Sequence, residues 1–209
     1  MDLRNIDCME LMKEFKDKHF DLAIVDPPYG ISISQDLAIR GQTCKKNGYR
    51  AWGYKEWDSS IPSAEYYKEL IRVSKNQIVW GGNYFTAHLP PSRCWLIWDK
   101  GQRDFSFADA ELAWTSFESS VRVFGYARGK LLAQGKIHPT EKPIDLYRWI
   151  LKNYAKEGDK ILDTHLGSGS IAIACEQEKY DLTGSEIDTE YYNKMMKRIE
   201  TETMQTSLF

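Results

Sequence analysis

The stretch Lys160-Ile-Leu-Asp-Thr-His-Leu-Gly-Ser-Gly-Ser-Ile-Ala172 decides the fold of this chain. Its apolar first residues end at Asp163 and predict a buried strand, and Gly167 and Gly169 allow a turn that comes close to a ligand before a helix begins. A second strand ends at Glu186, about 20 residues further on, where a carboxylate can accept both ribose hydroxyls of an adenosine. The pattern predicts an adenosine site in an α/β sheet, and an NAD-binding unit fits it equally well.

The tetrapeptide Asp26-Pro27-Pro28-Tyr29 follows an apolar strand at residues 22–25. It brings together a carboxylate, backbone carbonyls of prolines and an aromatic face, which suits an exocyclic amine on a flat heterocycle. Such an amine is a poor nucleophile because its lone pair is delocalised into the ring. Two acceptors, the Asp26 carboxylate and the Pro27 carbonyl, favour the pyramidal nitrogen that can attack. Taken alone, the tetrapeptide could equally be a strand-to-loop exit.

An adenosine site combined with an amine-activating tetrapeptide implies S-adenosylmethionine as methyl donor and an aromatic amine as acceptor. With these two motifs in this order, the chain resembles the circularly permuted β group of DNA amino-methyltransferases, in which the catalytic motif comes first and the donor motif last. The resemblance covers nearly the whole chain and includes residues 6–11, 76–85, 95–100, 107–114 and 138–143.

The resemblance implies a single domain over residues 1–209, with a Rossmann-like, circularly permuted α/β fold whose seven-stranded mixed sheet has helices on both faces. Apolar spacing predicts a helix over 64–74. Thr140 is expected to cap a helix that runs to Ala155, with Pro143 in its first turn. The last helix is expected from Glu190 to about Glu200, with a frayed tail after it.

The resemblance also implies the roles of the site residues. Asp26 and Pro27 hold the amine, Pro28 completes the motif, and Tyr29 stacks on the base. Asp7 contacts the donor's adenine, Glu186 its ribose, Asp163 its methionine part, and Thr140 and Lys142 its carboxylate. The expected donor site consists of Asp7, Asp26, Thr140, Lys142, Asp163, His165, Gly167, Ser168, Gly169 and Glu186. The family usually has Pro-Phe where this chain has Thr164-His165, which adds a titratable ring.

Two segments, residues 37–55 and 119–136, are basic and contain aromatic residues, a mixture typical of nucleic-acid contact. Residues 30–61 are expected to form a mobile lid over the base and residues 118–137 a short target-recognition segment. The alternative is that both are solvated loops or plain insertions. The residues expected to bind DNA are Arg40, Lys45, Lys46, Arg50, Trp52, Arg122, Arg128 and Lys130. So short a segment predicts a short or degenerate recognition sequence, or a homodimer.

Composition agrees with one cytoplasmic domain. The chain has 209 residues, 42% of them hydrophobic, and a net charge of −2, and no stretch approaches the ~18 apolar residues of a membrane span. No signal peptide is recognised. Its four cysteines lie far apart, which argues against a metal site and a disulfide framework.

The expected substrate is adenine in double-stranded DNA, flipped out of the helix and methylated at N6. Four alternatives stay open: a cytosine-N4 methyltransferase, an RNA or protein amine methyltransferase, a catalytically silent nucleic-acid-binding module, and an NAD-dependent oxidoreductase.

Overall fold

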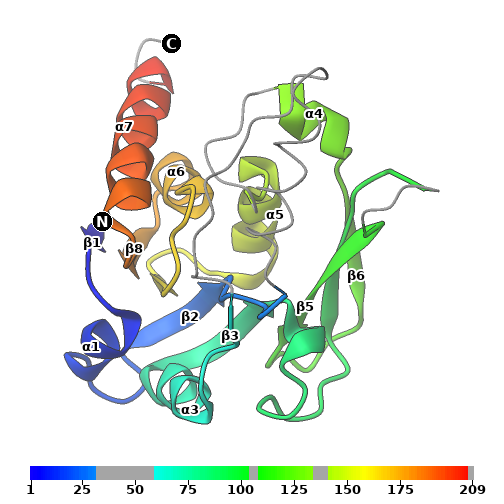
Figure 1. Cartoon of the computed structure of the whole chain (residues 1–209), viewed down its shortest axis with the longest axis vertical. Helices are drawn as coiled ribbons and strands as arrows, with labels where there is room; N and C mark the ends of the chain where they lie inside the picture. The colour runs from blue at the N-terminus through cyan, green and yellow to red at the C-terminus, as the bar shows by residue number, and fades with distance from the viewer. Residues whose placement is uncertain (32–58, 104–107, 134–140, 207–209) are drawn as a thin grey trace.

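The computed structural model describes residues 1–31, 59–103, 108–133 and 141–206. They form one eight-stranded mixed sheet between two layers of helices (Figure 1). In chain order the strands are β1 (Asp2–Arg4), β2 (Phe20–Val25), β3 (Ser74–Trp80), β4 (Trp95–Asp99), β5 (Ala110–Thr115), β6 (Arg122–Gly125), β7 (Lys160–Asp163) and β8 (Asp181–Ser185). The helices are α1 (Cys8–Lys13), α3 (Ala64–Val73), the 3₁₀ turn η3 (Gly82–Tyr84), α4 (Arg128–Ala133), α5 (Ile144–Tyr154), α6 (Ser170–Glu178) and α7 (Thr189–Thr206).

The strand order across the sheet is β1-β8-β7-β2-β3-β5-β4-β6. The first five strands in this order are parallel, β5 is antiparallel to β3 and β4, and the edge strand β6 is parallel to β4. As a result, the carboxyl ends of β8, β7, β2, β3 and β4 share one sheet edge with the amino end of β5. We call this edge the carboxyl edge.

Both faces of the sheet are buried at its central strands, and the residues of β2 show why. Leu22 and Ile24 point into the core formed with α5, α6 and α7. Ala23 and Val25 point into the core formed with α1 and α3. Successive strand residues face opposite sides, so a strand between two helical layers must be apolar throughout. Figure 1 shows α1 and α3 on one side of the sheet and α5, α6 and α7 on the other.

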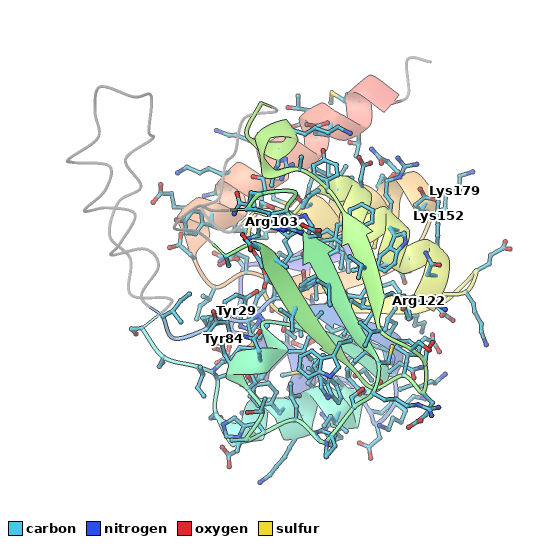
Figure 2. The ribbon with its side chains drawn as sticks, turned by 90° about the vertical axis from the view of Figure 1, so that its right-hand side faces the viewer. Tyr29, Tyr84, Arg103, Arg122, Lys152 and Lys179 are labelled. Carbon is cyan, nitrogen blue, oxygen red and sulfur yellow. The ribbon has the colours of Figure 1, made fainter. Side chains whose placement is uncertain are left out.

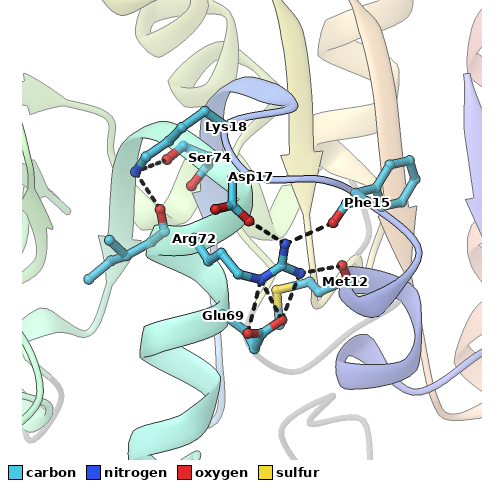
Figure 3. Close-up of polar contacts among 8 residues, drawn as sticks. Met12, Phe15, Asp17, Lys18, Glu69, Arg72 and Ser74 are labelled. Atoms are coloured by element: carbon cyan, nitrogen blue, oxygen red, sulfur yellow. Dashed lines mark hydrogen bonds and ion pairs between the residues drawn. The ribbon is translucent and has the colours of Figure 1, made fainter.

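Arg72, near the end of α3, fastens the connection between α1 and β2 (Figure 3). Its guanidinium donates to the carbonyl of Phe15 at 2.9 Å, to that of Met12 at 3.1 Å, and to the Asp17 carboxylate at 3.0 Å. Glu69, one turn earlier, orients it through two further oxygens. These bonds fix where β2 starts, and β2 ends at the tetrapeptide Asp26-Pro27-Pro28-Tyr29.

The fold class expected from the sequence is confirmed, but the sheet has eight strands and not seven. The additional strand is β6, inside the segment expected to recognise the target. Most of its side chains are exposed, because it lies at the edge of the sheet, so it lacks the apolar pattern that would have revealed it.

Two helix ends also differ from the prediction. α5 begins at Ile144, because Pro143 has extended backbone angles (φ −62°, ψ 141°) and occupies the N-cap position. α7 continues to Thr206 instead of ending near Glu200. Its threonine hydroxyls bond back to helix carbonyls, as Thr203 does to Ile199, and no glycine or proline ends the helix earlier. No described helix is long and apolar enough to cross a membrane.

Candidate active site at the carboxyl edge

Three predicted site residues lie at the ends of neighbouring parallel strands. Asp26 follows β2, Asp163 ends β7, and Glu186 follows β8. β2 pairs with β7, and β7 pairs with β8, so motifs from both ends of the chain meet at the carboxyl edge. Lys142 reaches the same place from the segment before α5 and contacts Asp26. Ligands of open α/β sheets bind at this edge.

Both carboxylate oxygens of Asp26 accept hydrogen bonds. Tyr29 donates its hydroxyl to Oδ1 at 2.7 Å, and Lys142 donates its Nζ to Oδ2 at 2.5 Å. Burial raises the pKa of the Asp26 carboxyl, and the Lys142 charge opposes that rise. Of the neighbouring residues, Pro27 is buried and Pro28 partly buried. The carboxylate is therefore oriented before any substrate arrives.

Lys142 is 1% exposed and belongs to a chain of alternating charges. Its Nζ lies 3.2 Å from Glu111 Oε2, and Lys100 Nζ lies 2.7 Å from Glu111 Oε1. Burial alone would lower the pKa of Lys142, but Asp26 and Glu111 outweigh it and hold the pKa above its ordinary value. Burial likewise disfavours the Glu111 carboxylate, yet the two lysines bring its pKa down to about 2.

Lys142 was expected beside the donor's carboxylate, and that stays a prediction; its contacts here are with Asp26 and Glu111. Glu111 and Lys100 were not predicted as site residues. A signal for Glu111 did exist, because it is the one charged residue in the stretch Ala110-Glu-Leu-Ala-Trp114. A charge in an otherwise apolar strand has to find a partner.

Tyr29 is held on several sides. Its ring stacks on that of Tyr84, with centroids 5.0 Å apart and planes 17° apart, and the two lie next to one another in Figure 2. Phe85 contacts it edge-on at 6.0 Å. Gly81 has a φ of +69°, and a Cβ there would lie 2.2 Å from a carbon of the Tyr29 ring. Tyr84 is 44% exposed and was not predicted as a site residue.

The glycine-rich turn is shaped by Glu186. One carboxylate oxygen accepts from the Gly167 amide at 2.9 Å, and the other accepts from the Asp188 amide at 2.9 Å. Gly167 and Gly169 have φ values of +51° and +74°, which only glycine adopts at little cost. Ser168 Oγ lies 3.1 Å from Ser170 Oγ. The acid thus fixes the turn that the sequence predicted to approach a ligand.

Asp163 and His165 differ from ordinary surface groups. Asp163 is 1% exposed, and burial raises its pKa to about 8, although the His165 amide donates to its Oδ1 at 2.9 Å. His165 Nδ1 lies 2.9 Å from the Thr164 hydroxyl, whose other partner is Tyr66 at 2.7 Å. Desolvation lowers the pKa of His165 to about 4. The ring is therefore uncharged at neutral pH, and it does not bring the charge that a titratable group could have added.

Asp7 caps α1, accepting on Oδ1 from the amides of Met9 at 2.7 Å and Glu10 at 3.4 Å. Other predicted residues fall outside the described part of the chain. They are Thr140, Arg40, Lys45, Lys46, Arg50 and Trp52, together with most of the expected lid.

Among the basic residues of the segment 118–137 whose side chains are described, Arg122 and Lys130 lie apart. Arg122 pairs with Leu96 at the start of β4, away from the carboxyl edge. Lys130 lies beyond the other end of β6, in α4, with its Nζ 3.9 Å from Asp145 near the start of α5. Arg128 begins α4, but its side chain is outside the described part. In Figure 2, Arg122 lies across the view from Tyr29.

Known proteins show what this arrangement belongs to. Residues 86–197 match the family of N6 and N4 methyltransferases described as DNA methylase. Type II methyltransferase M2.DpnII of Streptococcus pneumoniae is 37% identical, over 97% of this chain and 90% of its own. Type II methyltransferase M.HpaI of Haemophilus parainfluenzae is 34% identical, over 97% of this chain and 76% of its own. The chain belongs to the DNA methylase family.

Solved structures share the fold of this methylase. The M1.HpyAVI–SAM complex superposes with a TM-score of 0.58 at 20% identity, covering 94% of this chain and 98% of that one. The cytosine-N4-specific PvuII DNA methyltransferase superposes with a TM-score of 0.61 at 12% identity, covering 96% and 89%. The expectation of a DNA amino-methyltransferase is confirmed at the level of the family.

Proposed function

We propose that this protein transfers a methyl group from S-adenosylmethionine to the N6 amine of adenine in DNA. The observation that carries the proposal is the Asp26 carboxylate, pre-oriented at the end of β2 beside the strand that ends at Asp163. A hydrogen-bond acceptor for the amine and the glycine-rich turn expected to bind adenosine thus lie at the same carboxyl edge.

The residues proposed to bind the methyl donor suit a cationic adenosine derivative. S-adenosylmethionine, when bound, supplies an electrophilic methyl group on a positively charged sulfur. A buried carboxyl group such as Asp163 complements a positive charge. Glu186 uses one lone pair of each oxygen on a backbone amide and keeps others for ribose hydroxyls. Asp7, whose Oδ1 caps α1, is assigned to the adenine through its second oxygen. His165 and Ser168 are proposed as further donor contacts, as is Thr140, which lies outside the described part of the chain.

In the amine half, Asp26 accepts one N–H of the amine and the Pro27 carbonyl accepts the other. The amine takes the place of the Tyr29 hydroxyl on Oδ1, while Lys142 stays on Oδ2. Tyr29, positioned by Gly81 and Tyr84, then offers its ring to the base. The nitrogen becomes positively charged as its new bond to the methyl carbon forms and the bond from that carbon to sulfur breaks, which leaves S-adenosylhomocysteine. The Asp26 carboxylate balances the charge on the nitrogen. The proton that the amine must lose leaves through Asp26.

The choice of adenine comes from the residue at position 26, since cytosine-N4 members of the family more often have Ser there. The fold does not discriminate, because a cytosine-N4-specific enzyme shares it. Cytosine-N4 methylation is therefore the second candidate. The proposed circular permutation is supported by the chain order, in which β2 precedes β7 although the two are neighbours in the sheet.

The proposal extends to the parts that contact DNA. Residues 30–61 act as a lid over the flipped base, and α4 contributes phosphate contacts through Arg128 and Lys130. Because the segment 118–137 is short, we expect either a short or degenerate recognition sequence or a homodimer that grips the duplex.

The test is methyl incorporation from labelled donor into duplex DNA, RNA and protein, followed by digestion of the DNA and separation of its nucleosides. The proposal expects label in duplex DNA as N6-methyl-2′-deoxyadenosine. Label in N4-methyl-2′-deoxycytidine would establish the second candidate. Label only in RNA or protein, or in none of the three, would overturn the proposal.

A further inference from the structure

Glu111 is an acid at the active site to which the reaction described above gives no task. It lies at the amino end of β5, opposite Trp98 of β4. Because β5 is antiparallel to its neighbours, this end reaches the carboxyl edge, where Asp26 lies. The Glu111 side chain is 23% exposed and contacts Lys142 and Lys100 with different oxygens.

Lys142 is the link between Glu111 and Asp26. Its Nζ lies 2.5 Å from Asp26 Oδ2 and 3.2 Å from Glu111 Oε2. It also lies 5.2 Å from the centre of the Trp80 ring. An ammonium with Asp26 as its only anionic partner would bind that carboxylate with its full charge. With two carboxylates in contact, the charge is divided, and the position of Nζ is fixed from both sides.

We propose that Glu111 is a positioning residue for methyl transfer, which holds Lys142 on Oδ2 of Asp26 and divides its charge so that Oδ1 stays a strong acceptor for the amine. The proposal rests on the proposed function, because it needs Asp26 to hold that amine.

The electrostatics of Asp26 agree with this role. The titratable groups around its carboxylate come from several elements and are Tyr29, Lys142, Glu111, Tyr147 and Asp163. The pKa of Asp26 is raised first by burial, is lowered by Lys142, and is raised again by the negative charge of Glu111. Loss of the Glu111 charge should therefore lower the pKa of Asp26 and weaken it as an acceptor.

The test compares Glu111→Gln with wild type in single-turnover methylation of DNA across pH. Glu111→Gln should lower the rate on the order of 10- to 100-fold, because the reacting groups are misplaced and the acceptor is weaker. With saturating donor, which keeps Asp163 ionised, the acid limb of the profile reports ionisation of Asp26 and should move to lower pH by about one unit. Donor affinity from calorimetry should stay within about twofold. Glu157→Gln, an exposed acid in the turn before β7, is the control with the same change in net charge.

Two further variants keep the proposal falsifiable if Glu111→Gln does not fold. Glu111→Asp retains the charge and should recover part of the rate, with an acid limb near that of wild type. Lys100→Met removes the other partner of Glu111, lets Glu111 draw Lys142 away from Asp26, and should move the acid limb to higher pH. A folded Glu111→Gln protein with the rate and acid limb of wild type would overturn the proposal, as would shifts in the same direction in Glu111→Gln and Lys100→Met. Wild-type protein that methylates no DNA would instead refute the proposed function.

Discussion

The carboxyl group of Asp163 has an uncommonly high pKa. Burial raises its pKa to about 8, so it is largely protonated at pH 7 in the ligand-free protein. A ligand with a positive charge beside it favours the ionised form. Binding of the donor should therefore release a proton from this residue.

The first prediction follows from that linkage. Donor affinity should rise with pH between about 6 and 8, by up to tenfold per unit, and level off above the pKa of Asp163. Calorimetry in buffers of different ionisation enthalpy measures both the affinity and the proton release. Asp163→Asn should bind the donor more weakly and lose this slope, which separates it from titration of the donor's own amino group. An affinity that does not change between pH 6 and 8 would show that Asp163 does not face the donor's charge.

The sequence predicted the functional side chains that lie at the ends of strands, such as Asp26 and Asp163. It did not find the partners that act on them across the fold. Lys142 and Asp26 are 116 positions apart, and the sequence around either residue contains no pattern that predicts their contact. Tyr84 was missed for the same reason, since its stacking on Tyr29 depends on how η3 leaves β3.

At the scale of secondary-structure elements, the turn after β3 supports Tyr29 through Gly81. Gly81→Ala should place a methyl group where the Tyr29 ring now lies and displace the ring that is proposed to stack on the base. The methylation rate should fall on the order of 100-fold, since this displacement reaches the reacting groups, while donor affinity is retained. The measurement is single-turnover transfer together with donor calorimetry.

Gly158→Ala is the matched control for that substitution. Gly158 has a φ of +83°, close to the +69° of Gly81, but a Cβ there would meet nothing within 4 Å. Both variants should lose about 1–2 kcal/mol of unfolding free energy from left-handed backbone strain. Only Gly81→Ala should also lose methylation activity. Equal activity in the two variants would contradict the support of Tyr29 by this turn.

The end of α3 provides a prediction for stability alone. Arg72→Met keeps the length of the side chain but removes its bonds to Met12, Phe15 and Asp17. The free energy of unfolding in urea should fall by about 1.5–3 kcal/mol, the range for hydrogen bonds to charged groups. Lys68→Met, on the same helix and 76% exposed, should cost less than about 1 kcal/mol. A similar loss in both variants would show that Arg72 does not fasten the connection.

The elements that the sequence predicted well are those with a clear apolar pattern. The strands β2 and β7 are buried on both faces, and α3 has a buried stripe of Tyr66, Tyr67, Leu70 and Val73. The sequence could not reveal β6, whose residues are mostly exposed, because its position depends on pairing with β4. The start of α5 was predicted a few residues too early, because threonine is a favoured N-cap residue and Thr140 precedes the helix.

For the molecule as a whole, net charge says little about DNA binding and the position of its cations says more. Arg128→Ala with Lys130→Ala should weaken DNA binding and reduce the salt slope by about two phosphate equivalents. Binding titrations at several salt concentrations measure both effects. Arg122→Ala with Lys152→Ala removes the same charge from the region that Figure 2 shows away from Tyr29. This control should leave the slope nearly unchanged, and equal slopes in the two double variants would place the DNA elsewhere.

The most direct test of the whole account is methyl transfer by Asp26→Ala under single-turnover conditions, with saturating donor and duplex DNA. Loss of the acceptor at Oδ1 should slow transfer on the order of 100-fold or more, while the protein stays folded and binds the donor through Asp163 and Glu186. Asp26→Asn keeps one acceptor oxygen and the shape of the side chain. Its transfer rate should lie between those of Asp26→Ala and wild type. A folded Asp26→Ala protein that methylates DNA at close to the wild-type rate would contradict the account.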